Sequence, residues 1–437
     1  MENQIRHPLA YARSMRGWSQ TDLARKIRKT AERRGLRSGA VKQRISKWEN
    51  GRANPDDDSQ DLLAEVFDTD PALVRALGWP HWVPGYDSTL SLGPGSTVPA
   101  LREALKLSID RRAFLGYTGA SLTGIALQWA VSEPSAMADA RGGSRVDANL
   151  VDMLEDHSVR LTALATEQRQ HAARLLDAHL TTVTDLIADG RYTSGMGKRL
   201  HALAASLSQT VGWYRFDHGR HASAARFWHG ALHSAHASGD RDLGAGVLSD
   251  LAYQATWLRD PRTAVEILEH ALTRVTHPTA RSLLHLRKAR AHAALGESAV
   301  CNRSLAAAER ELGAAAGDPS PAWCAWMSPS DLAVDSGRCQ LDLGDPRKAH
   351  QLIQEGTGLL PHARTKTRAV FRTYEAGAFL RSGNIDQAAA AASEALTMAN
   401  RIGAPRCVAL VRDLVPAFTG HASAEGVPEL LELARAS

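Results

Sequence analysis

The chain has few of the residues that mark secreted, disulfide-bonded or metal-binding proteins. Its 437 residues include only four cysteines, none in a Cys-x-x-Cys pair, and aromatic residues make up 5%. Thiols used in this way are typical of a reducing cytoplasm, where they are mostly small buried side chains. Residues 1–8 are polar and contain no secretory signal, so we expect no export by that route. The cysteines are Cys301, Cys324, Cys339 and Cys407.

Catalytic signatures are absent as well. The sequence has no Ser/His/Asp order, paired carboxylates, phosphate-binding loop or glycine fingerprint, so we expect neither an enzyme nor a bound cofactor. Strand signals are absent from about residue 150 onward, and the abundant Ala, Leu and Arg favour helices. We therefore predict an all-α protein of roughly two to four domains.

Charge is distributed unevenly along the chain. Residues 1–55 hold 14 Lys/Arg against 4 Asp/Glu, a net charge of +10, whereas the remainder holds 38 against 43, a net charge of −5. A basic N-terminal segment, which we call the head, followed by a mildly acidic remainder indicates that the head binds a polyanion. A solvated basic surface without a partner is the other interpretation.

The most informative stretch is a short helix expected from about Ala40 to Glu49. Val41, Ile45 and Trp48 recur at helical spacing and give it one apolar face. Asn50-Gly51 ends the helix, because glycine adopts positive φ without strain. The outward residues are then Lys42, Gln43, Arg44, Ser46 and Lys47.

Further helices are predicted on both sides of this one. A first helix ends at Gly17, and a second starts after Ser19, which can form an approximate capping box with Asp22. A fourth is expected at about residues 59–67, and a short fifth around Leu73–Leu77.

About the first 80 residues resemble the Cro-like helix-turn-helix domains of phage repressors, the XRE family. The motifs that carry the resemblance are Ser19-Gln20 followed by Leu23-Ala24, and Ile45-Ser46-x-Trp48-Glu49-Asn50-Gly51 with Pro55 behind. The resemblance implies a five-helix DNA-binding domain at residues 1–80. It also implies that Arg13 and Glu49 link the first and third helices.

The same resemblance assigns candidate DNA-binding residues. Gln20 starts the second helix, where the family contacts phosphate or base, and Lys42, Gln43 and Lys47 lie on the face that reads base edges. Lys donates to guanine O6 and N7, and Gln pairs with adenine. An ordinary solvated side chain is the alternative at each position. The full set is Arg16, Ser19, Gln20, Lys42, Gln43, Arg44, Lys47 and Arg52, of which the three arginines are better placed for phosphates.

The chain departs from the family between the second and third helices. Leu23 and Ile45 lie 22 residues apart, roughly twice the family's usual separation. The extra residues 25–38 include seven Lys/Arg, and we expect them to extend the second helix until it breaks at Gly35. They could add phosphate contacts. They also leave the start of the recognition helix open by a residue or two.

Residues 81–149 are predicted to be a linker with a short apolar helical segment. Pro, Gly and Ser gather at residues 84–99, and residues 133–149 indicate a second flexible stretch. Between them, Arg111-Arg112-Ala113-Phe114-Leu115 resembles a twin-arginine export signal. We expect no membrane span, because this motif follows the head and the apolar run behind it contains glycines. A buried connecting helix and an irregular Gly-rich segment both remain open.

Residues 150–437 are predicted to form a repeat array. Helices meet small-residue turns at Gly219, Arg259, Gly296, Gly344 and Gly383, which are 40, 37, 48 and 39 residues apart. A small Ala follows most of these turns, and the insertion 317–323 accounts for the long interval. The array resembles the tetratricopeptide class with a longer period, which implies an α-solenoid of helical hairpins with a concave binding side.

Candidate binding groups occur within this array. His229, His233 and His236 share one helical face and could hold Zn²⁺ or Ni²⁺, although a His-rich surface helix is commoner. Arg287, Lys288 and Arg290 form a basic stripe that could meet a carboxylate. Six aromatics form either core or a ligand wall, namely Trp213, Tyr214, Phe227, Trp228, Tyr253 and Trp257. The candidate ligand residues are Tyr253, Trp257, Arg287 and Arg290.

The sequence therefore predicts a cytoplasmic, nucleoid-associated transcriptional regulator and not an enzyme. The layout resembles peptide-pheromone-responsive regulators of Gram-positive bacteria and related regulators of actinomycetes. The expected partners are a double-stranded DNA operator, a second copy of the chain and a peptide or small-molecule signal. The alternative is an adaptor whose array recruits a protein partner, with DNA binding secondary.

Overall fold

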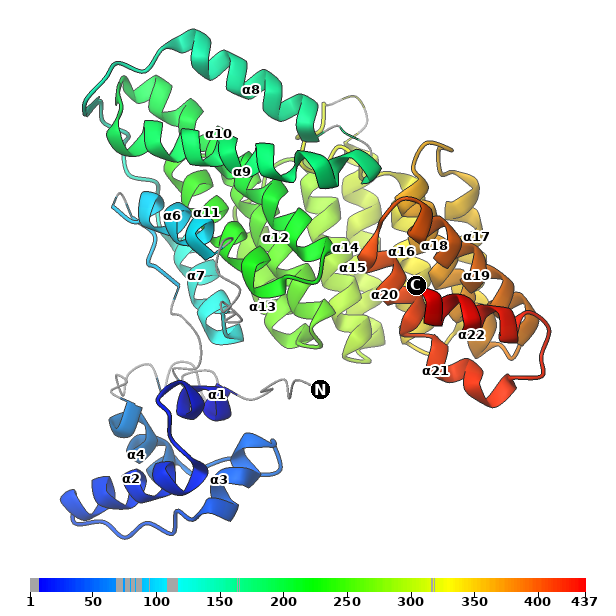
Figure 1. The fold of residues 1–437 in the computed structure, drawn as a ribbon, viewed down its shortest axis with the longest axis horizontal. Coiled ribbons are helices and arrows are strands. Elements are labelled where there is room, and N and C mark those ends of the chain that lie inside the picture. Colours follow the sequence, from blue (N-terminus) through cyan, green and yellow to red (C-terminus); the bar gives the residue numbers. More distant parts are fainter. Residues whose placement is uncertain are drawn as a thin grey trace. The chain divides into compact units, whose positions relative to one another are not determined.

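The computed structural model describes residues 8–67, 74, 79, 83, 89–93, 95–107, 117–162, 164, 166–315, 317 and 319–437. Regular structure in these residues is almost entirely α-helical, which confirms the predicted all-α class (Figure 1). Contacts along the chain define two compact units. The first, called the head, comprises residues 1–90 and 114–125, and the second, called the array, comprises residues 91–113 and 126–437.

The head packs its helices around one apolar core. Leu23, Ile45, Trp48 and Leu63 are among its fully buried side chains. The predicted fifth helix lies outside the described residues, apart from Val74, which is helical. The described helices are α1 (Pro8–Met15), α2 (Gln20–Arg33), α3 (Lys42–Glu49) and α4 (Asp57–Phe67).

Local sequence signals account for the bounds of α2. The Ser19 hydroxyl accepts from the Asp22 backbone N–H, and the Asp22 carboxylate accepts from the Ser19 backbone N–H, so the predicted capping box is present. The helix runs on through the basic extension and stops before Gly35, whose φ of 68° lies in the left-handed region. The predicted extension of the second helix is therefore confirmed.

Two helices lie within the stretch predicted to be a linker, α6 (Thr97–Leu107) and α7 (Gly119–Val131). Within the array, the Trp129 indole of α7 lies so close to Gly244 that an added Cβ would come within 2.5 Å of its Nε1. Arg241 Nη1 also donates to the Trp129 carbonyl at 3.0 Å. The end of α7 is thus fixed to the array. The Arg111–Leu115 motif lies outside the described residues.

A two-residue antiparallel pair corrects the expectation of no strand after residue 150. β1 (Ala140–Arg141) pairs with β2 (Arg191–Tyr192). The pair forms because the segment before α8 (Ala148–Thr162) returns along the turn between α9 (Thr166–Asp189) and α10 (Ser194–Asp217). At that turn the Gly143 N–H donates to the Asp189 carbonyl at 2.8 Å. Residues 133–149 were expected to be flexible, and this part of them is instead held by backbone hydrogen bonds.

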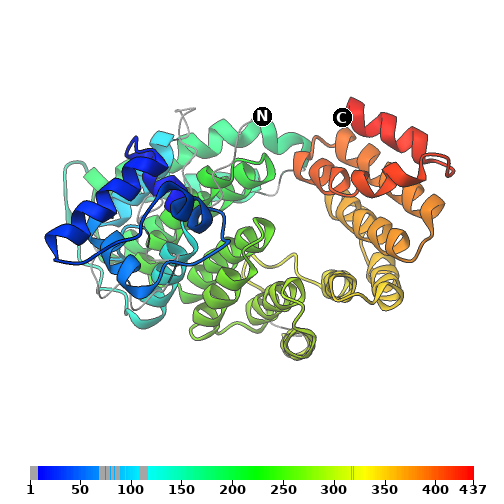
Figure 2. The same ribbon diagram turned by 90° about the horizontal axis from the view of Figure 1, so that it is seen from below.

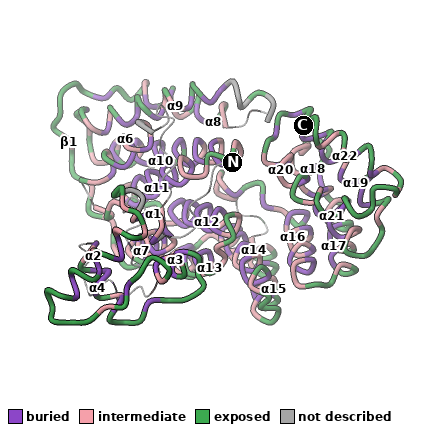
Figure 3. Tube along the Cα trace, turned by 60° about the horizontal axis from the view of Figure 1, so that its bottom comes forward, coloured by how far each residue is buried: buried purple, intermediate pink, exposed green. Residues whose placement is uncertain are grey.

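The array is a solenoid of helical hairpins, as the repeat pattern predicts. Its first hairpins are strongly buried, especially along α10, α11 and α12 (Figure 3). The paired helices are α10 (Ser194–Asp217) with α11 (His221–Ser238), α12 (Arg241–Trp257) with α13 (Pro261–Leu272), α14 (Pro278–Ala294) with α15 (Ser298–Ala314), α16 (Pro329–Asp342) with α17 (Pro346–Gly358), and α18 (Thr365–Arg381) with α19 (Ile385–Arg401). They are flanked by α8 (Ala148–Thr162), α9 (Thr166–Asp189), α20 (Pro405–Arg412), α21 (Val415–Phe418), η1 (Thr419–His421) and α22 (Val427–Ala436).

Each hairpin turn contains one residue in the left-handed region, at the five predicted positions. Arg259, with φ of 67°, is the one non-glycine among them. The alanines behind the turns are buried, including Ala264, Ala349 and Ala388 at 0% exposure. These small side chains let the two helices of a hairpin pack closely, as predicted.

The first helices of the five hairpins and the flanking helix α20 form a continuous inner row, made of α10, α12, α14, α16, α18 and α20. Each contacts the next in the row, and α20 also contacts α10, so the row closes on itself. In Figure 2 the hairpins follow one another along a curve, from the green helices through the yellow to the orange and red ones. No helix in the described part of the chain is long and apolar enough to cross a membrane.

Candidate nucleic-acid interface and ligand site

A buried carboxylate fixes α3 to the two helices before it. Glu49, at the end of α3, receives Arg13 Nε on Oε1 at 2.6 Å and Arg13 Nη2 on Oε2 at 3.2 Å. The same Oε2 accepts from Gln20 Nε2 at 2.6 Å. The predicted link between the first and third helices is confirmed, and Gln20 extends it to α2. The side-chain amide of Gln20 is therefore already hydrogen-bonded within the head.

The outward face of α3 carries three polar side chains without partners. Lys42, Gln43 and Lys47 are exposed, and none has a hydrogen bond or ion pair within the described residues. On the opposite face, Ile45 and Trp48 are buried. A helix can contact base edges in a major groove when the protein core holds it in place and its outward side-chain donors are not already hydrogen-bonded.

One residue of the predicted apolar face is placed differently. Val41 is 43% exposed, because it is the N-cap of α3 with extended backbone angles of φ −133° and ψ 161°. The helical spacing does not apply to a residue that precedes the helix. The helix therefore starts two residues later than predicted.

Most of the other candidate DNA-binding residues already have partners within the head. Ser19 caps α2, and Arg16 donates to the Ala12 carbonyl at 3.1 Å while its guanidinium lies over the Phe67 ring at 5.0 Å. Arg44 Nη2 contacts Asp56 Oδ2 at 3.1 Å. Only Arg52 joins the three residues of α3 in being exposed without such a partner among the described residues.

The basic extension adds further positive charge to the head. Arg28, Lys29 and Arg37 are exposed and form no ion pair within the described part of the chain. Arg33 and Arg34 share one carboxylate, Glu65, at 3.3 and 4.0 Å. The head thus retains an excess of unneutralised cations, which attracts a polyanion.

In the array, the inner row carries a buried polar network centred on Asp250 of α12. Arg287 Nη1 donates to Asp250 Oδ1 and to Ser249 Oγ, both at 2.7 Å. Gln209 Nε2 and Trp213 Nε1 donate to Asp250 Oδ2 at 2.7 and 3.0 Å. Burial raises the pKa of Asp250, and Arg287 opposes that rise.

The candidate ligand residues Tyr253 and Trp257 lie one to two turns further along α12. The Arg287 guanidinium lies 5.2 Å from the Tyr253 ring centroid. On the other side, Arg406 Nη1 of α20 donates to the Tyr253 hydroxyl at 2.9 Å, and its guanidinium lies 5.9 Å from the Trp257 ring. The structure thus joins Tyr253, Trp257 and Arg287 in one connected cluster.

An ion triplet links α10, at one end of the inner row, to α18 and α20 at the other end. Asp217, the last residue of α10, receives Arg406 Nε on Oδ1 at 2.8 Å and Lys366 Nζ of α18 on Oδ2. Burial by itself raises the pKa of Asp217, but the two cations outweigh it and the pKa is lowered. We call these three residues the closure contact.

The basic stripe of α14 splits between two faces. Arg290 Nη1 pairs with Asp335 of α16, and its guanidinium lies 5.5 Å from the Tyr374 ring. Lys288 instead pairs with Glu269 of α13 at 2.9 Å, away from the inner row. Arg287 and Arg290 therefore belong to the candidate site, and Lys288 does not.

The histidines of α11 are not on a surface helix, which corrects that expectation. His229, His233 and His236 are 2%, 1% and 7% exposed. They are buried because α6 packs against α11, and His233 Nδ1 lies 3.2 Å from Ser96 Oγ while its Nε2 lies 3.1 Å from His229 Nε2. The described residues contain no group of three or more His, Cys, Asp or Glu placed to hold a metal ion.

The aromatic cluster divides between the two roles proposed for it. Phe227 and Trp228 are fully buried and serve as core. Trp213, Tyr253 and Trp257 are half-buried and surround the arginines of the inner row.

The sequence did not reveal the charged partners of these residues. Asp217, Asp250, Lys366 and Arg406 each look like isolated charges on amphipathic helices. One signal in the sequence could have indicated the site. Asp250, Tyr253 and Trp257 recur at spacings of three and four, which places them on one face of α12.

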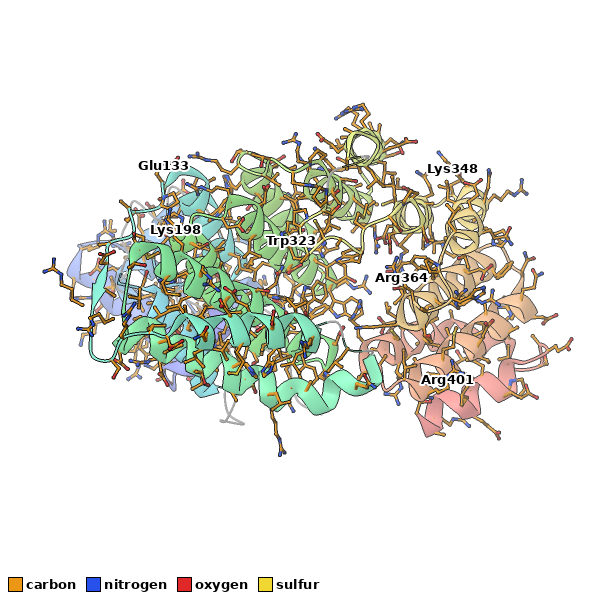
Figure 4. All side chains as sticks on the ribbon, turned by 90° about the horizontal axis from the view of Figure 1, so that it is seen from above. Glu133, Lys198, Trp323, Lys348, Arg364 and Arg401 are labelled. Carbon is orange, nitrogen blue, oxygen red and sulfur yellow. The ribbon has the colours of Figure 1, made fainter. Side chains whose placement is uncertain are left out.

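The insertion 317–323 also contributes to the array. Trp323 packs with Ala205, Ala235 and Leu243, and an added Cβ on Gly246 would meet its ring at 2.8 Å. Figure 4 marks Trp323 among the helices and Lys348 and Arg364 on the later hairpins. The insertion follows the third hairpin and is therefore anchored to α10, α11 and α12, which belong to the first two hairpins.

Comparisons with known proteins give limited similarities. A family model described as the SP15 N-terminal domain matches residues 9–75, within the head. No curated protein matches the chain. Among solved structures, the chain is similar to one described as "Crystal Structure of Rap Protein Complexed with Competence and Sporulation Factor", at 13% identity and a TM-score of 0.42, covering 66% of this chain and 98% of that chain.

Proposed function

We propose that the protein is a one-component transcriptional regulator of the XRE type. Its head binds a double-stranded DNA operator through α3, and its array binds a peptide or small-molecule signal and mediates dimerisation. In this proposal the chain acts on the nucleoid in the cytoplasm, catalyses no reaction and needs no cofactor.

The observation that carries the proposal is the outward face of α3. Lys42, Gln43 and Lys47 offer free donors on a helix braced by Arg13, Glu49 and Gln20. Base contacts would thus need no internal bond to break, and the helix would keep its orientation. The surrounding excess of exposed Lys and Arg supports phosphate contacts that position the helix.

The inner row supports the second part of the proposal. A signal with polar groups would meet Arg287, Arg290 and Tyr253, which come from adjacent turns of neighbouring helices. A dimer supports specificity, because two heads would read two half-sites whose separation the arrays set. Signal binding would then change DNA affinity by altering that separation.

Selection from a pool of random duplexes with the full-length chain tests the DNA-binding part directly. We expect an enriched motif for the wild type and none for the Lys42→Ala/Gln43→Ala double variant. Lys348→Ala, which removes an exposed charge from α17 of the array, is the control and should enrich the wild-type motif. The absence of an enriched motif for the wild type, or enrichment of the wild-type motif by the double variant, would overturn the proposal.

Analytical ultracentrifugation tests the dimer. We expect a dimer on operator duplexes that carry two half-sites. A monomer both free and on DNA would contradict this part of the proposal.

A further inference from the structure

The closure contact is built from elements far apart in the sequence. Lys366 and Arg406 come from α18 and α20, which lie 149 and 189 residues after Asp217 of α10. Other neighbours in the inner row are consecutive hairpins tied together by their own turns. The ends of the row have no such covalent support, so their approach depends on the side chains that meet there.

The contact has more positive than negative charge. Two cations share the carboxylate of Asp217, and neither has a second carboxylate partner among the described residues. The other carboxylates of the inner row that form described ion pairs each have one cation, as Asp250 has Arg287. The closure contact is therefore the place in this row where an additional anion is most favourable.

Helix ends strengthen this preference. Lys366 and Arg406 each lie in the first turn of their helices, and neither first turn contains an acidic residue. The positive ends of both helix dipoles thus add to the two side-chain charges. Asp217 occupies the last turn of α10, where a carboxylate is unfavourable for its own helix. The position of Asp217 is explained by its ion pairs with Lys366 and Arg406.

Arg406 is held in place independently of Asp217. Its guanidinium lies within 5.9 Å of the ring centroids of Phe216, Tyr253 and Trp257, and its Nη1 donates to the Tyr253 hydroxyl. An arginine fixed between aromatic rings loses little conformational entropy when a carboxylate arrives. The cationic side of the contact is therefore a preorganised carboxylate site.

We infer that Lys366 and Arg406 form a binding site for an external carboxylate, and that Asp217 is its internal occupant. A ligand carboxylate that displaces Asp217 releases α10 from α18 and α20 and opens the ring of helices. This inference deepens the proposed function, since it names a carboxylate as the chemistry of the signal and ring opening as its effect.

Distance measurements between spin labels test the inference in the full chain. Asp217→Ala removes the carboxylate that links α10 to Lys366 and Arg406, so the ring should open. Spin labels at the exposed positions Arg220 and Arg412 report the separation of α10 from α20. We expect a longer and broader distance distribution in the variant, with or without acetate. The wild type should shift toward that distribution in concentrated acetate and should not shift in chloride at the same ionic strength.

A matched control distinguishes closure from the loss of any buried ion pair. Asp335→Ala removes the partner of Arg290 between consecutive hairpins, and should leave the distance between the labels unchanged. Lys366→Gln keeps a neutral Asp217–Arg406 pair and should stay closed. If Asp217→Ala does not fold, Asp217→Asn removes the charge with the same side-chain shape and takes its place.

The outcomes separate the site from the proposed function. An unchanged distance in the Asp217 variant overturns the closure role, and a wild-type distance that acetate leaves unchanged overturns the carboxylate site. DNA binding is measured separately by gel shift. A chain that opens with acetate yet binds no DNA would keep the carboxylate site and lose the regulator.

Discussion

The head and the array use the same kinds of side chain in opposite ways. In the head, Lys42, Gln43 and Lys47 point outward from α3 without partners among the described residues. In the array, arginines of the inner row are half-buried or buried and paired with carboxylates, as Arg287 is with Asp250 at 2.7 Å. The difference teaches that polarity alone does not indicate a binding surface. A ligand of the inner row must replace an internal carboxylate, whereas the donors of α3 have no described partner to exchange.

Two residues of the head lie between these extremes. Gln20 and Arg44 bond to Glu49 and Asp56, although both were candidates for DNA contact. Either would have to exchange an internal partner for a phosphate or base. Lys42, Gln43 and Lys47 are therefore stronger candidates for contact with DNA bases than Gln20 and Arg44.

The largest expected effect is in the array. Asp250→Ala leaves the Arg287 guanidinium buried without its carboxylate, and we expect a loss of about 3–5 kcal/mol in the free energy of unfolding. Urea unfolding followed by circular dichroism measures it. Glu269→Ala removes the partner of Lys288 in an exposed pair and should cost at most about 1 kcal/mol. Equal effects of the two substitutions would break the distinction between the inner row and the outer face.

The pH dependence of array stability follows from a buried imidazole. Burial lowers the pKa of His201 from the usual 6.5 to about 4. The unfolded chain binds this proton below about pH 6.5 and the folded chain only below about pH 4, so the folded state loses stability as the pH falls through this window. The expected loss is roughly 3 kcal/mol. Burial also lowers the pKa of His221 and His236, which adds in the same direction.

Substitution tests the assignment of this pH effect. Thermal unfolding between pH 7 and 4 should show a shallower loss of stability for His201→Phe than for the wild type. His157→Phe, at an exposed position of α8, should keep the wild-type slope. An identical slope in all three proteins would show that His201 is not the source.

In the head, Glu49→Ala should reduce both stability and DNA affinity. Arg13 and Gln20 lose their shared acceptor, which we expect to cost about 1.5–3 kcal/mol of unfolding free energy, as for hydrogen bonds to charged groups. The orientation of α3 would also be lost, so operator binding should weaken even at temperatures where the variant is folded. Full operator affinity in the folded variant would contradict the bracing role.

The smallest expected effect concerns a free phosphate contact. Arg52→Ala should leave stability within about 0.5 kcal/mol of the wild type, because the side chain has no described partner. It should also reduce the slope of log affinity against log salt by about 0.9. Fluorescence anisotropy with labelled duplex at several salt concentrations gives this slope, and Lys348→Ala should not change it.

Local signals in the sequence were sufficient to predict the helices of the head. The capping box of Ser19 and Asp22, the stop at Gly35 and the Arg13–Glu49 link depend on near neighbours or on the family motif. Val41 was misplaced because periodicity does not show where a helix starts. In the array, the hairpin turns were predicted because each needs a residue at positive φ.

The inner row could be predicted only in part. Tyr253, Trp257 and Arg287 stand out because aromatics and cations cluster along two helices. The closure contact joins Asp217 to Arg406, and their approach depends on the curvature accumulated over five hairpins. No single segment encodes that curvature, so the sequence pattern did not indicate the pair.

The affinity gap between a selected operator and a scrambled duplex of the same composition tests the central claim most directly. The account predicts that the wild-type full-length chain prefers the operator by about 10³-fold or more at physiological salt. It predicts that Lys42→Ala/Gln43→Ala binds both duplexes with nearly the scrambled-duplex affinity while remaining folded. Equal affinity of the wild type for both duplexes, or an unchanged preference in the double variant, would contradict it.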